Sequence, residues 1–141
     1  MTVYVVDASV ASRFLLIEEW SDKATSLLRN FASGTVDLQA PELVNYEVGN
    51  TLWKAVRRKL LTIEEASEKL SDLMKLRLSS IQLNEDECQD ALAWGVKNDA
   101  TYYDSVYVIA SKKIGAPLLT ADRTLYEKAS KEVTTVQLRD L

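Results

Sequence analysis

Four acidic residues lie in four separate segments of the chain, each where a turn or a helix would present its side chain at one end of a sheet. They are Asp7, Glu47, Asp104 and Asp122. Carboxylates that are held together repel one another, and a fold that gathers them usually does so to bind a divalent cation. The chain has no histidine and one cysteine. The chemistry that these residues predict is therefore that of oxygen ligands around a hard metal, Mg²⁺ or Mn²⁺.

Each of these acids also has a purely structural explanation. Asp7 and Asp122 can cap the helices that follow them, because aspartate is a favoured N-cap residue. Asp104 lies three residues after Thr101 and can be the acidic half of a capping box. Glu47 can be a solvated helix residue or can pair with Lys54 or Arg57. Taken singly, a cap explains a carboxylate without a metal, so the elements around the acids matter.

Strands and helices alternate along the predicted chain. Hydrophobic spacing and turn signals predict strands at 3–6, 36–39, 81–83, 118–120 and 134–137. Helices are predicted at 8–17, 21–32, 41–58, from 62 onward, at 84–97, at 101–114 and from 123 onward. Ser21 is expected to be the N-cap of the second helix, and the pairs Thr62–Glu65 and Asn84–Glu87 have capping-box spacing. This alternation predicts an α/β fold with a mostly parallel five-stranded sheet and helices on both faces.

The predicted sheet has an edge at which the four acids can meet. In open parallel sheets, ligands bind beyond the carboxyl ends of the strands, near the point where the strand order reverses. Asp7 and Asp122 each follow a strand and so fall at that edge. Glu47 and Asp104 belong to helices that can pack beside it. We therefore expect the four side chains to converge despite their distance in sequence.

The composition limits the classes of protein to which this chain can belong. With 141 residues, of which 47% are hydrophobic, residues 1–141 are expected to form one domain. No apolar stretch approaches the length of a membrane span, and the N-terminus does not resemble a signal peptide. The chain also has a single cysteine. Together these features predict a soluble cytoplasmic protein.

The net charge of −4 argues against a general nucleic-acid coat protein but allows a nucleic-acid enzyme with local basic patches. The best basic patch contains Lys54, Arg57 and Arg58. It could steer an RNA backbone, or it could simply be a solvated helix end where cations suit the helix dipole.

The sequence around the acids is more specific than capping requires. Asp-Ala-Ser follows a strand, Pro-x-x-x-x-x-Glu lies on a helix, Tyr-Asp-Ser opens an apolar helix, and Leu-Leu-Thr-Ala-Asp follows Gly-Ala-Pro. In this order, and over nearly the whole chain, the sequence resembles the PIN-domain family, and within it the VapC-type toxins of toxin–antitoxin pairs. The most specific segment is YYDSVYVIASKKIGAPLLTADRTLYEKA.

That resemblance implies a metal-dependent endoribonuclease that hydrolyses RNA as the toxin of a type II toxin–antitoxin system. The acids implied to be catalytic and to bind Mg²⁺ or Mn²⁺ are Asp7, Glu47, Asp104 and Asp122. Ser9 and Thr120 take the place of assisting hydroxyl groups. Attack by water would leave a 5′-phosphate. The partners implied are an RNA substrate and a cognate antitoxin, with a homodimer as the expected assembly.

Two other classes of function remain open from the sequence. A PIN-like module without activity could act by binding other proteins. A receiver-like phosphoacceptor domain has a comparable layout but usually carries paired acids after its first strand, where this chain has Asp7-Ala8-Ser9. The same segment fits a haloacid-type phosphatase poorly, because Ser9 occupies the place of the second aspartate.

Overall fold

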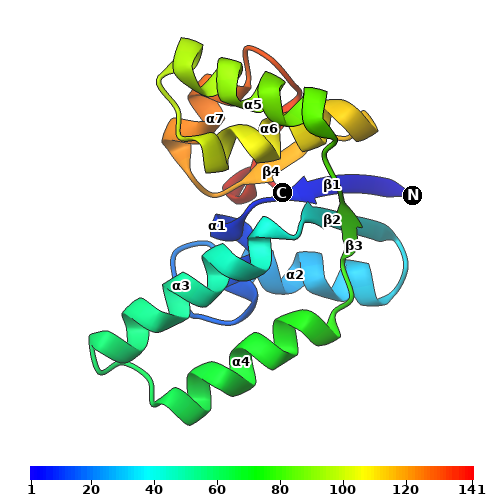
Figure 1. The fold of residues 1–141 in the computed structure, drawn as a ribbon. Coiled ribbons are helices and arrows are strands. Elements are labelled where there is room, and N and C mark those ends of the chain that lie inside the picture. Colours follow the sequence, from blue (N-terminus) through cyan, green and yellow to red (C-terminus); the bar gives the residue numbers. More distant parts are fainter.

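The computed structural model describes the whole chain, Met1 to Leu141, and places a five-stranded sheet between two sets of helices (Figure 1). All strand pairs are parallel, in the order β3-β2-β1-β4-β5. The strands are β1 (Thr2–Val6), β2 (Val36–Pro41), β3 (Ser79–Ile81), β4 (Leu118–Thr120) and β5 (Thr135–Gln137). The predicted α/β fold with a five-stranded parallel sheet is thus confirmed.

Helices cover both faces of the sheet. The first set is α1 (Ala8–Ala11), the 3₁₀ turn η1 (Ser12–Phe14), α2 (Ser21–Ala32), α3 (Leu43–Arg57) and α4 (Ile63–Lys75). The second is α5 (Glu85–Asn98), α6 (Tyr102–Ile114) and α7 (Arg123–Ala129), and a 3₁₀ turn, η2 (Leu138–Asp140), ends the chain. Figure 1 shows α5, α6 and α7 on one side of the strands and α1 to α4 on the other. None of these helices combines the length and the apolar character needed to cross a membrane.

The chain reverses its direction of travel across the sheet between β1 and β4. From β1 it moves outward to β2 and β3, then returns over the other face to β4 and continues outward to β5. Because such crossovers are right-handed, the two directions of travel place their helices on opposite faces. The reversal point between β1 and β4 is the place where open α/β sheets bind ligands.

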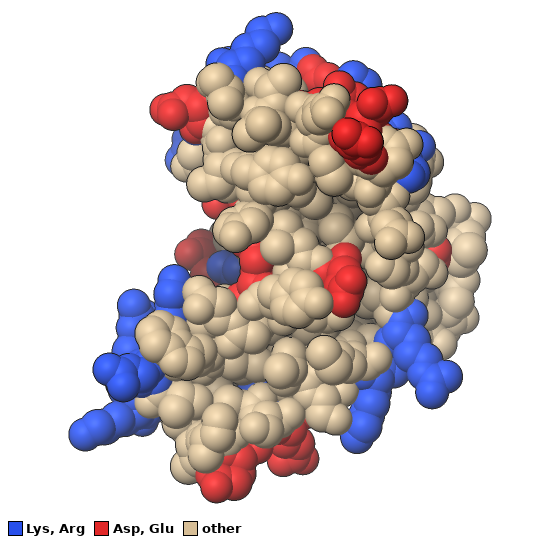
Figure 2. All heavy atoms as spheres, in the orientation of Figure 1, with Lys and Arg blue, Asp and Glu red and all other residues tan.

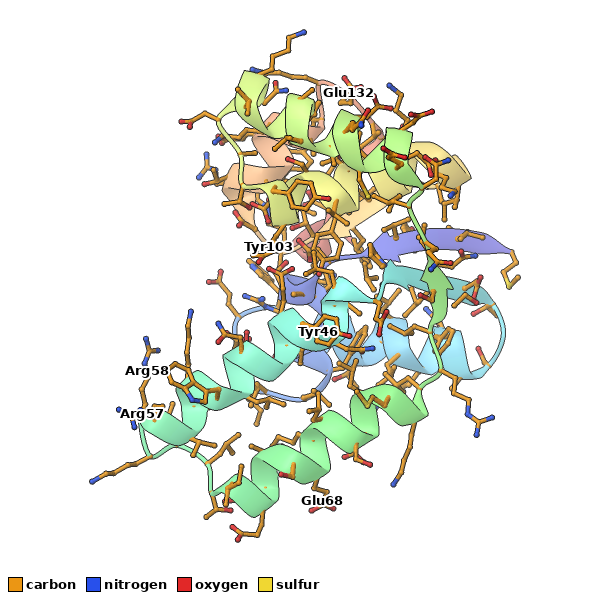
Figure 3. The ribbon with its side chains drawn as sticks, in the orientation of Figure 1. Tyr46, Arg57, Arg58, Glu68, Tyr103 and Glu132 are labelled. Carbon is orange, nitrogen blue, oxygen red and sulfur yellow. The ribbon has the colours of Figure 1, made fainter.

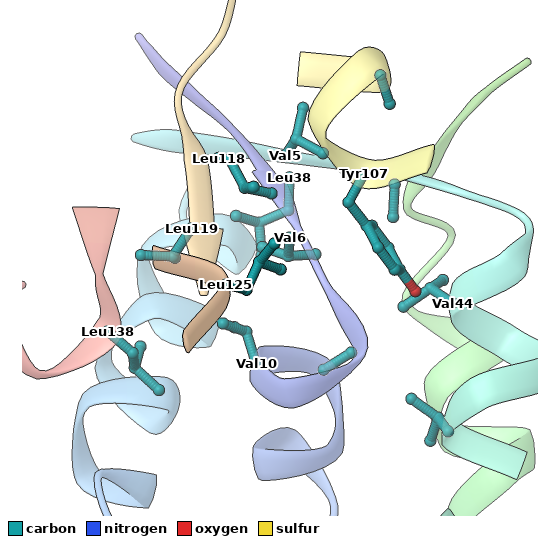
Figure 4. Close-up of a cluster of buried hydrophobic side chains, with 14 of the residues drawn as sticks. Val5, Val6, Val10, Leu38, Val44, Tyr107, Leu118, Leu119, Leu125 and Leu138 are labelled. Carbon is teal, nitrogen blue, oxygen red and sulfur yellow. The ribbon is translucent and has the colours of Figure 1, made fainter. Parts of the chain in front are cut away.

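The two central strands form the middle of the core. Val5 and Val6 of β1 pair with Leu118 and Leu119 of β4, and all four side chains are fully buried (Figure 4). Helix α6 packs against β1, β2 and β4, which agrees with the apolar residues found nearly all around it. The ends of β1 and β4 are therefore held by close packing.

Two helix starts are fixed by reciprocal capping boxes, as predicted. The backbone N–H of Glu65 donates to Thr62 Oγ1 at 3.1 Å, and Thr62 N–H donates back to Glu65 Oε1 at 3.0 Å. Asn84 and Glu87 form the same pair at 2.9 Å in both directions. Each box satisfies two backbone donors that a helix start otherwise leaves without partners.

The helix predicted at 8–17 is much shorter than expected. Helix α1 ends at Ala11 and continues only as the 3₁₀ turn. The Arg13 guanidinium explains the break, because its Nη1 donates to the carbonyl of Ser9 at 2.6 Å and its Nε to the carbonyl of Glu19 at 2.7 Å. The bond to Glu19 ties this side chain to the loop that follows the 3₁₀ turn, which holds the chain away from a continuous helical path.

Three smaller predictions also need correction. Strand β3 lies at Ser79–Ile81 rather than 81–83, because this edge strand pairs through its backbone with β2 and needs no apolar pattern. Pro41 ends β2 instead of opening α3. Ser21 begins α2 but is not its N-cap, since its hydroxyl donates to Leu16 O and accepts from Glu18 N–H.

Gly95 allows α5 to pack closely against the start of α6. A Cβ atom built at this position would lie 2.6 Å from Ser105 Oγ and 2.9 Å from the carbonyl oxygen of Ala100. Ser105 is fully buried, and its hydroxyl donates to the carbonyl of Thr101 at 2.7 Å. The contact therefore positions the turn of α6 that carries Asp104.

We predict that Gly95→Ala lowers the free energy of unfolding by about 1–3 kcal/mol, because overpacking costs more than the helix gains from alanine. Gly49→Ala in α3 is the matched control, since nothing lies within 4 Å of its added Cβ, and it should raise stability by up to about 1 kcal/mol. Chemical denaturation of both variants provides the measurement. Equal effects of the two substitutions would contradict the proposed close contact.

Candidate active site

Asp7 is a buried carboxylate at the end of β1, with 4% of its surface exposed. Its Oδ1 accepts hydrogen bonds from Ser9 Oγ at 2.6 Å and from Val10 N–H at 3.1 Å. Its Oδ2 accepts one from Thr120 Oγ1 at 2.5 Å. Asp7 thus caps α1, but it also reaches across to β4, which capping does not require. Three of its roughly four lone-pair sites are occupied, and one on Oδ2 remains for another ligand.

The two hydroxyl groups that bind Asp7 tie β1 to the turn after β4. Ser9 Oγ accepts from Ala121 N–H at 2.8 Å, and Thr120 Oγ1 accepts from Asp122 N–H at 3.0 Å. Each hydroxyl group thus donates its proton to Asp7 and accepts a hydrogen bond from a backbone N–H with its oxygen. These bonds fix the orientation of the Asp7 carboxylate and the start of the turn that carries Asp122.

Glu47 lies on α3 and is half-buried. Its Oε1 accepts a hydrogen bond from the Tyr107 hydroxyl at 2.7 Å. Tyr107 comes from α6 and is 1% exposed, and in Figure 4 its hydroxyl oxygen points toward α3. This bond holds Glu47 in place from the helix that also carries Asp104.

Asp104 and Asp122 complete the set. The backbone N–H of Asp104 donates to Thr101 Oγ1 at 3.1 Å, so Thr101 caps α6, and the reciprocal bond of a capping box is absent. Asp122 caps α7 through Oδ1, which accepts from the N–H groups of Thr124 at 2.9 Å and Leu125 at 3.2 Å. The structural explanation therefore holds for Asp122 and fails for the Asp104 side chain.

One cavity of about 820 Å³ is lined by all four acids, together with Ser9, Asn50, Arg13 and Lys54. Figure 2 shows acidic atoms in the notch between the α5–α6 part of the molecule and α3. Thr120 lies behind the cavity wall, where it is fully buried. Arg57 and Arg58 do not line the cavity. They lie at the far end of α3 (Figure 3), where Arg57 stacks over Trp53.

The acids share a cavity but do not stand as a ready set of metal ligands. No three of them approach closely enough to hold one ion as arranged. Asp7 faces the two hydroxyl groups, Glu47 faces Tyr107, and one oxygen of Asp122 faces the amides of α7. The structure therefore brings the four acids to one cavity but does not arrange them as a closed coordination shell.

The ionised form of the cavity carboxylates is energetically unfavourable. Burial raises the pKa of Asp7 to about 6, despite the bonds from Ser9 and Thr120 that act in the opposite direction. Burial also raises the pKa values of Glu47 and Asp104, and the negative charge of a neighbouring acid adds to both shifts. A bound cation would relieve this cost. The hard oxygen donors of the cavity are those that Mg²⁺ and Mn²⁺ prefer.

Several further cavity residues were not predicted from the sequence. They include Arg13, Glu18, Tyr46, Tyr103 and Tyr107. For Tyr107 a signal existed, because it lies three residues after Asp104 and so shares a face of α6 with it. The role of Arg13 has no local signal, since its partners are backbone carbonyl groups.

The raised pKa of Asp7 makes a prediction about the metal-free protein. Between pH 4 and 6 the folded state keeps a proton that the unfolded chain releases at its ordinary pKa of 3.8. The contribution of Asp7 to stability therefore falls as pH rises through this window and is constant above it. The difference between pKa values of 3.8 and about 6 corresponds to about 3 kcal/mol of stability.

We predict that in EDTA the stability of Asp7→Asn relative to the wild type improves by up to about 3 kcal/mol from pH 4 to pH 7, because asparagine does not titrate. Urea denaturation of both proteins across this range provides the measurement. A difference in unfolding free energy that does not change with pH would contradict the buried-carboxylate account.

Comparison with known proteins places the chain in a family. The model of the PIN domain matches residues 4–131. Ribonuclease VapC3 of Pyrobaculum aerophilum is 38% identical over 131 residues, which cover 92% of this chain and 97% of that protein. Exonuclease VapC9 of the same organism is 36% identical over 87 residues, which cover 61% of this chain and 62% of that protein.

Solved structures have the same fold. PAE2754 from Pyrobaculum aerophilum superposes with a TM-score of 0.74 at 24% identity, covering 99% of this chain and 92% of that one. VapBC2 from Rickettsia felis, solved bound to a DNA fragment from their promoter, has a TM-score of 0.69 at 13% identity, covering 96% and 98%. The matched residues 4–131 include the strand ends and helices that carry all four acids. The chain is a member of the PIN-domain family.

Proposed function

We propose that this protein is a metal-dependent endoribonuclease, the toxin of a type II toxin–antitoxin pair. The observation that supports this most strongly is the cavity at the β1–β4 reversal point, lined by four acids from four separate segments. Its relative VapC3, named a ribonuclease, is similar over almost its whole length. An RNA substrate and a cognate antitoxin are the partners that we propose, and the homodimer stays a prediction of the sequence.

Asp7, Asp104 and Asp122 would hold Mg²⁺ or Mn²⁺, with Glu47 binding directly or through water. A divalent ion supplies a water acidic enough to attack phosphorus near neutral pH, and it offsets the charge that grows on the phosphoryl oxygens. Ser9 and Thr120 keep the Asp7 carboxylate in one orientation. The Tyr107 bond to Oε1 of Glu47 leaves Oε2 able to take a proton from the attacking water.

The products distinguish this mechanism from others. Hydrolysis by water yields a 5′-phosphate and a 3′-hydroxyl, whereas attack by the ribose 2′-hydroxyl yields a cyclic phosphate. The similarity to a protein named an exonuclease favours exonucleolytic cleavage as the second candidate. Circular RNA separates the two, because it has no end from which an exonuclease can start.

We predict that the purified protein cleaves circular single-stranded RNA in Mg²⁺ or Mn²⁺ and loses this activity in EDTA, because a bound ion would supply the acidic water and offset the charge on the phosphoryl oxygens. Electrophoresis of the products and end-group analysis provide the measurement. Cleavage of linear RNA alone would support the exonuclease. Equal cleavage in EDTA would contradict the metal mechanism, and intact RNA in every condition would contradict nuclease function.

Of the three basic residues predicted to bind RNA, Lys54 is the one that lines the cavity. We propose that Lys54 contacts a phosphate near the cut and that Arg57 and Arg58 lie too far along α3 to do so. Lys54→Ala should then reduce the dependence of RNA affinity on salt by about one unit of log–log slope. The Arg57→Ala, Arg58→Ala double variant serves as the control and should keep the wild-type slope. The reverse result would restore the basic helix end as the RNA contact.

A further inference from the structure

Two tyrosine side chains stand exposed on the walls of the acidic cavity. Tyr46 of α3 is 66% exposed and Tyr103 of α6 is 57% exposed, and both line the cavity. Figure 3 shows them extending from these two helices. The third cavity tyrosine, Tyr107, is buried and bound to Glu47. Tyr46 and Tyr103 are therefore the aromatic rings at this site that are open to a ligand.

The chain fixes each ring next to one of the acids. Tyr46 directly precedes Glu47, and Tyr103 directly precedes Asp104. Adjacent residues on a helix point about 100° apart, so a ring beside a cavity-facing acid flanks that acid and does not cover it. The hydrogen bond from Tyr107 to Glu47 joins α3 and α6 across the site, so the two rings belong to opposite walls of one cavity.

Because the cavity is acidic, aromatic contacts should contribute more to RNA binding there than contacts to phosphate do. Five acids line the cavity, the four predicted ones and Glu18, and their charge repels a phosphate backbone. The chain as a whole carries a net charge of −4. Of the two cations that line the cavity, Arg13 is already bound to the carbonyls of Ser9 and Glu19. Stacking on a base needs no opposite charge and tolerates every base, because each base has a π-face. Unpaired bases stacked on tyrosine are a common means of binding single-stranded RNA.

We propose that Tyr46 and Tyr103 form a pair of stacking platforms that hold unpaired bases on either side of the phosphodiester to be cut. This inference rests on the proposed nuclease function and adds the two residues that would bind the unstacked bases of the single-stranded substrate. The Tyr46 hydroxyl donates to Glu42 Oε1 at 2.9 Å, which steadies that ring on α3. A base-paired duplex cannot offer its bases to these rings.

The test is single-turnover cleavage of a linear single-stranded RNA in Mn²⁺, with enzyme in excess, which separates half-saturation from the maximal rate. Tyr46→Leu and Tyr103→Leu should each raise the half-saturating enzyme concentration roughly tenfold, because leucine keeps apolar bulk and loses the planar face. The maximal rate should change much less, since the acids remain in place. Tyr46→Phe and Tyr103→Phe should stay within about twofold of the wild type, because phenylalanine keeps the ring.

Trp53→Leu is the matched control, because Trp53 is an exposed aromatic residue on the same helix as Tyr46 that does not line the cavity. It should leave half-saturation unchanged. Unchanged half-saturation in both tyrosine-to-leucine variants would overturn the proposal and leave the rings for a protein partner. Equal losses in the leucine and phenylalanine variants would assign the effect to the hydroxyl groups and also overturn it. A wild-type protein that cleaves no RNA would instead reject the nuclease function itself, and this inference with it.

Discussion

The structure depends on one buried carboxylate at the point where the order of the strands reverses. Asp7 can be buried at the end of β1 only because Ser9, Val10 and Thr120 donate hydrogen bonds to it. An unpaired buried charge would cost several kilocalories per mole. The same two hydroxyl groups, of Ser9 and Thr120, accept hydrogen bonds from the backbone after β4. These bonds set the position of Asp122. The same interaction thus caps a helix, joins the two central strands and orients a side chain of the cavity.

The other two acids reach this edge through helix packing. Tyr107 bridges α6 to Glu47 on α3, and the close contact at Gly95 places the first turn of α6, which holds Asp104. The result is a cavity in which burial and neighbouring charges raise the pKa values of Asp7, Glu47 and Asp104. Negative charge held together in this way is unfavourable, and a cation bound in the cavity would offset it. The cost to the folded protein would then be the source of the proposed metal affinity.

Much of this arrangement could be predicted from the sequence, because it follows from local patterns. The strand ends at Asp7 and Asp122 and the capping boxes at Thr62 and Asn84 are local, and the alternation of elements implies the parallel sheet. What could not be predicted depends on contacts between distant segments. The break after Ala11 comes from a side chain bound to backbone carbonyls. The serine-rich strand β3 exists through pairing with β2. Capping and site formation, which the sequence presents as alternatives for Asp7, turn out to be compatible.

The central claim is that the acids of the cavity bind a divalent ion as a group, and thermal melting with EDTA or Mn²⁺ tests it most directly. Binding to the native state stabilises it by mass action, by about 2.7 kcal/mol at a hundred times the dissociation constant. The wild type should show a clear rise in Tm with Mn²⁺, and Asp104→Asn a much smaller one. Asp99→Asn is the control, because Asp99 lies outside the cavity in a left-handed helix end that asparagine adopts readily, and it should respond like the wild type. A shift of wild-type size in Asp104→Asn, or no shift in the wild type, would contradict the account.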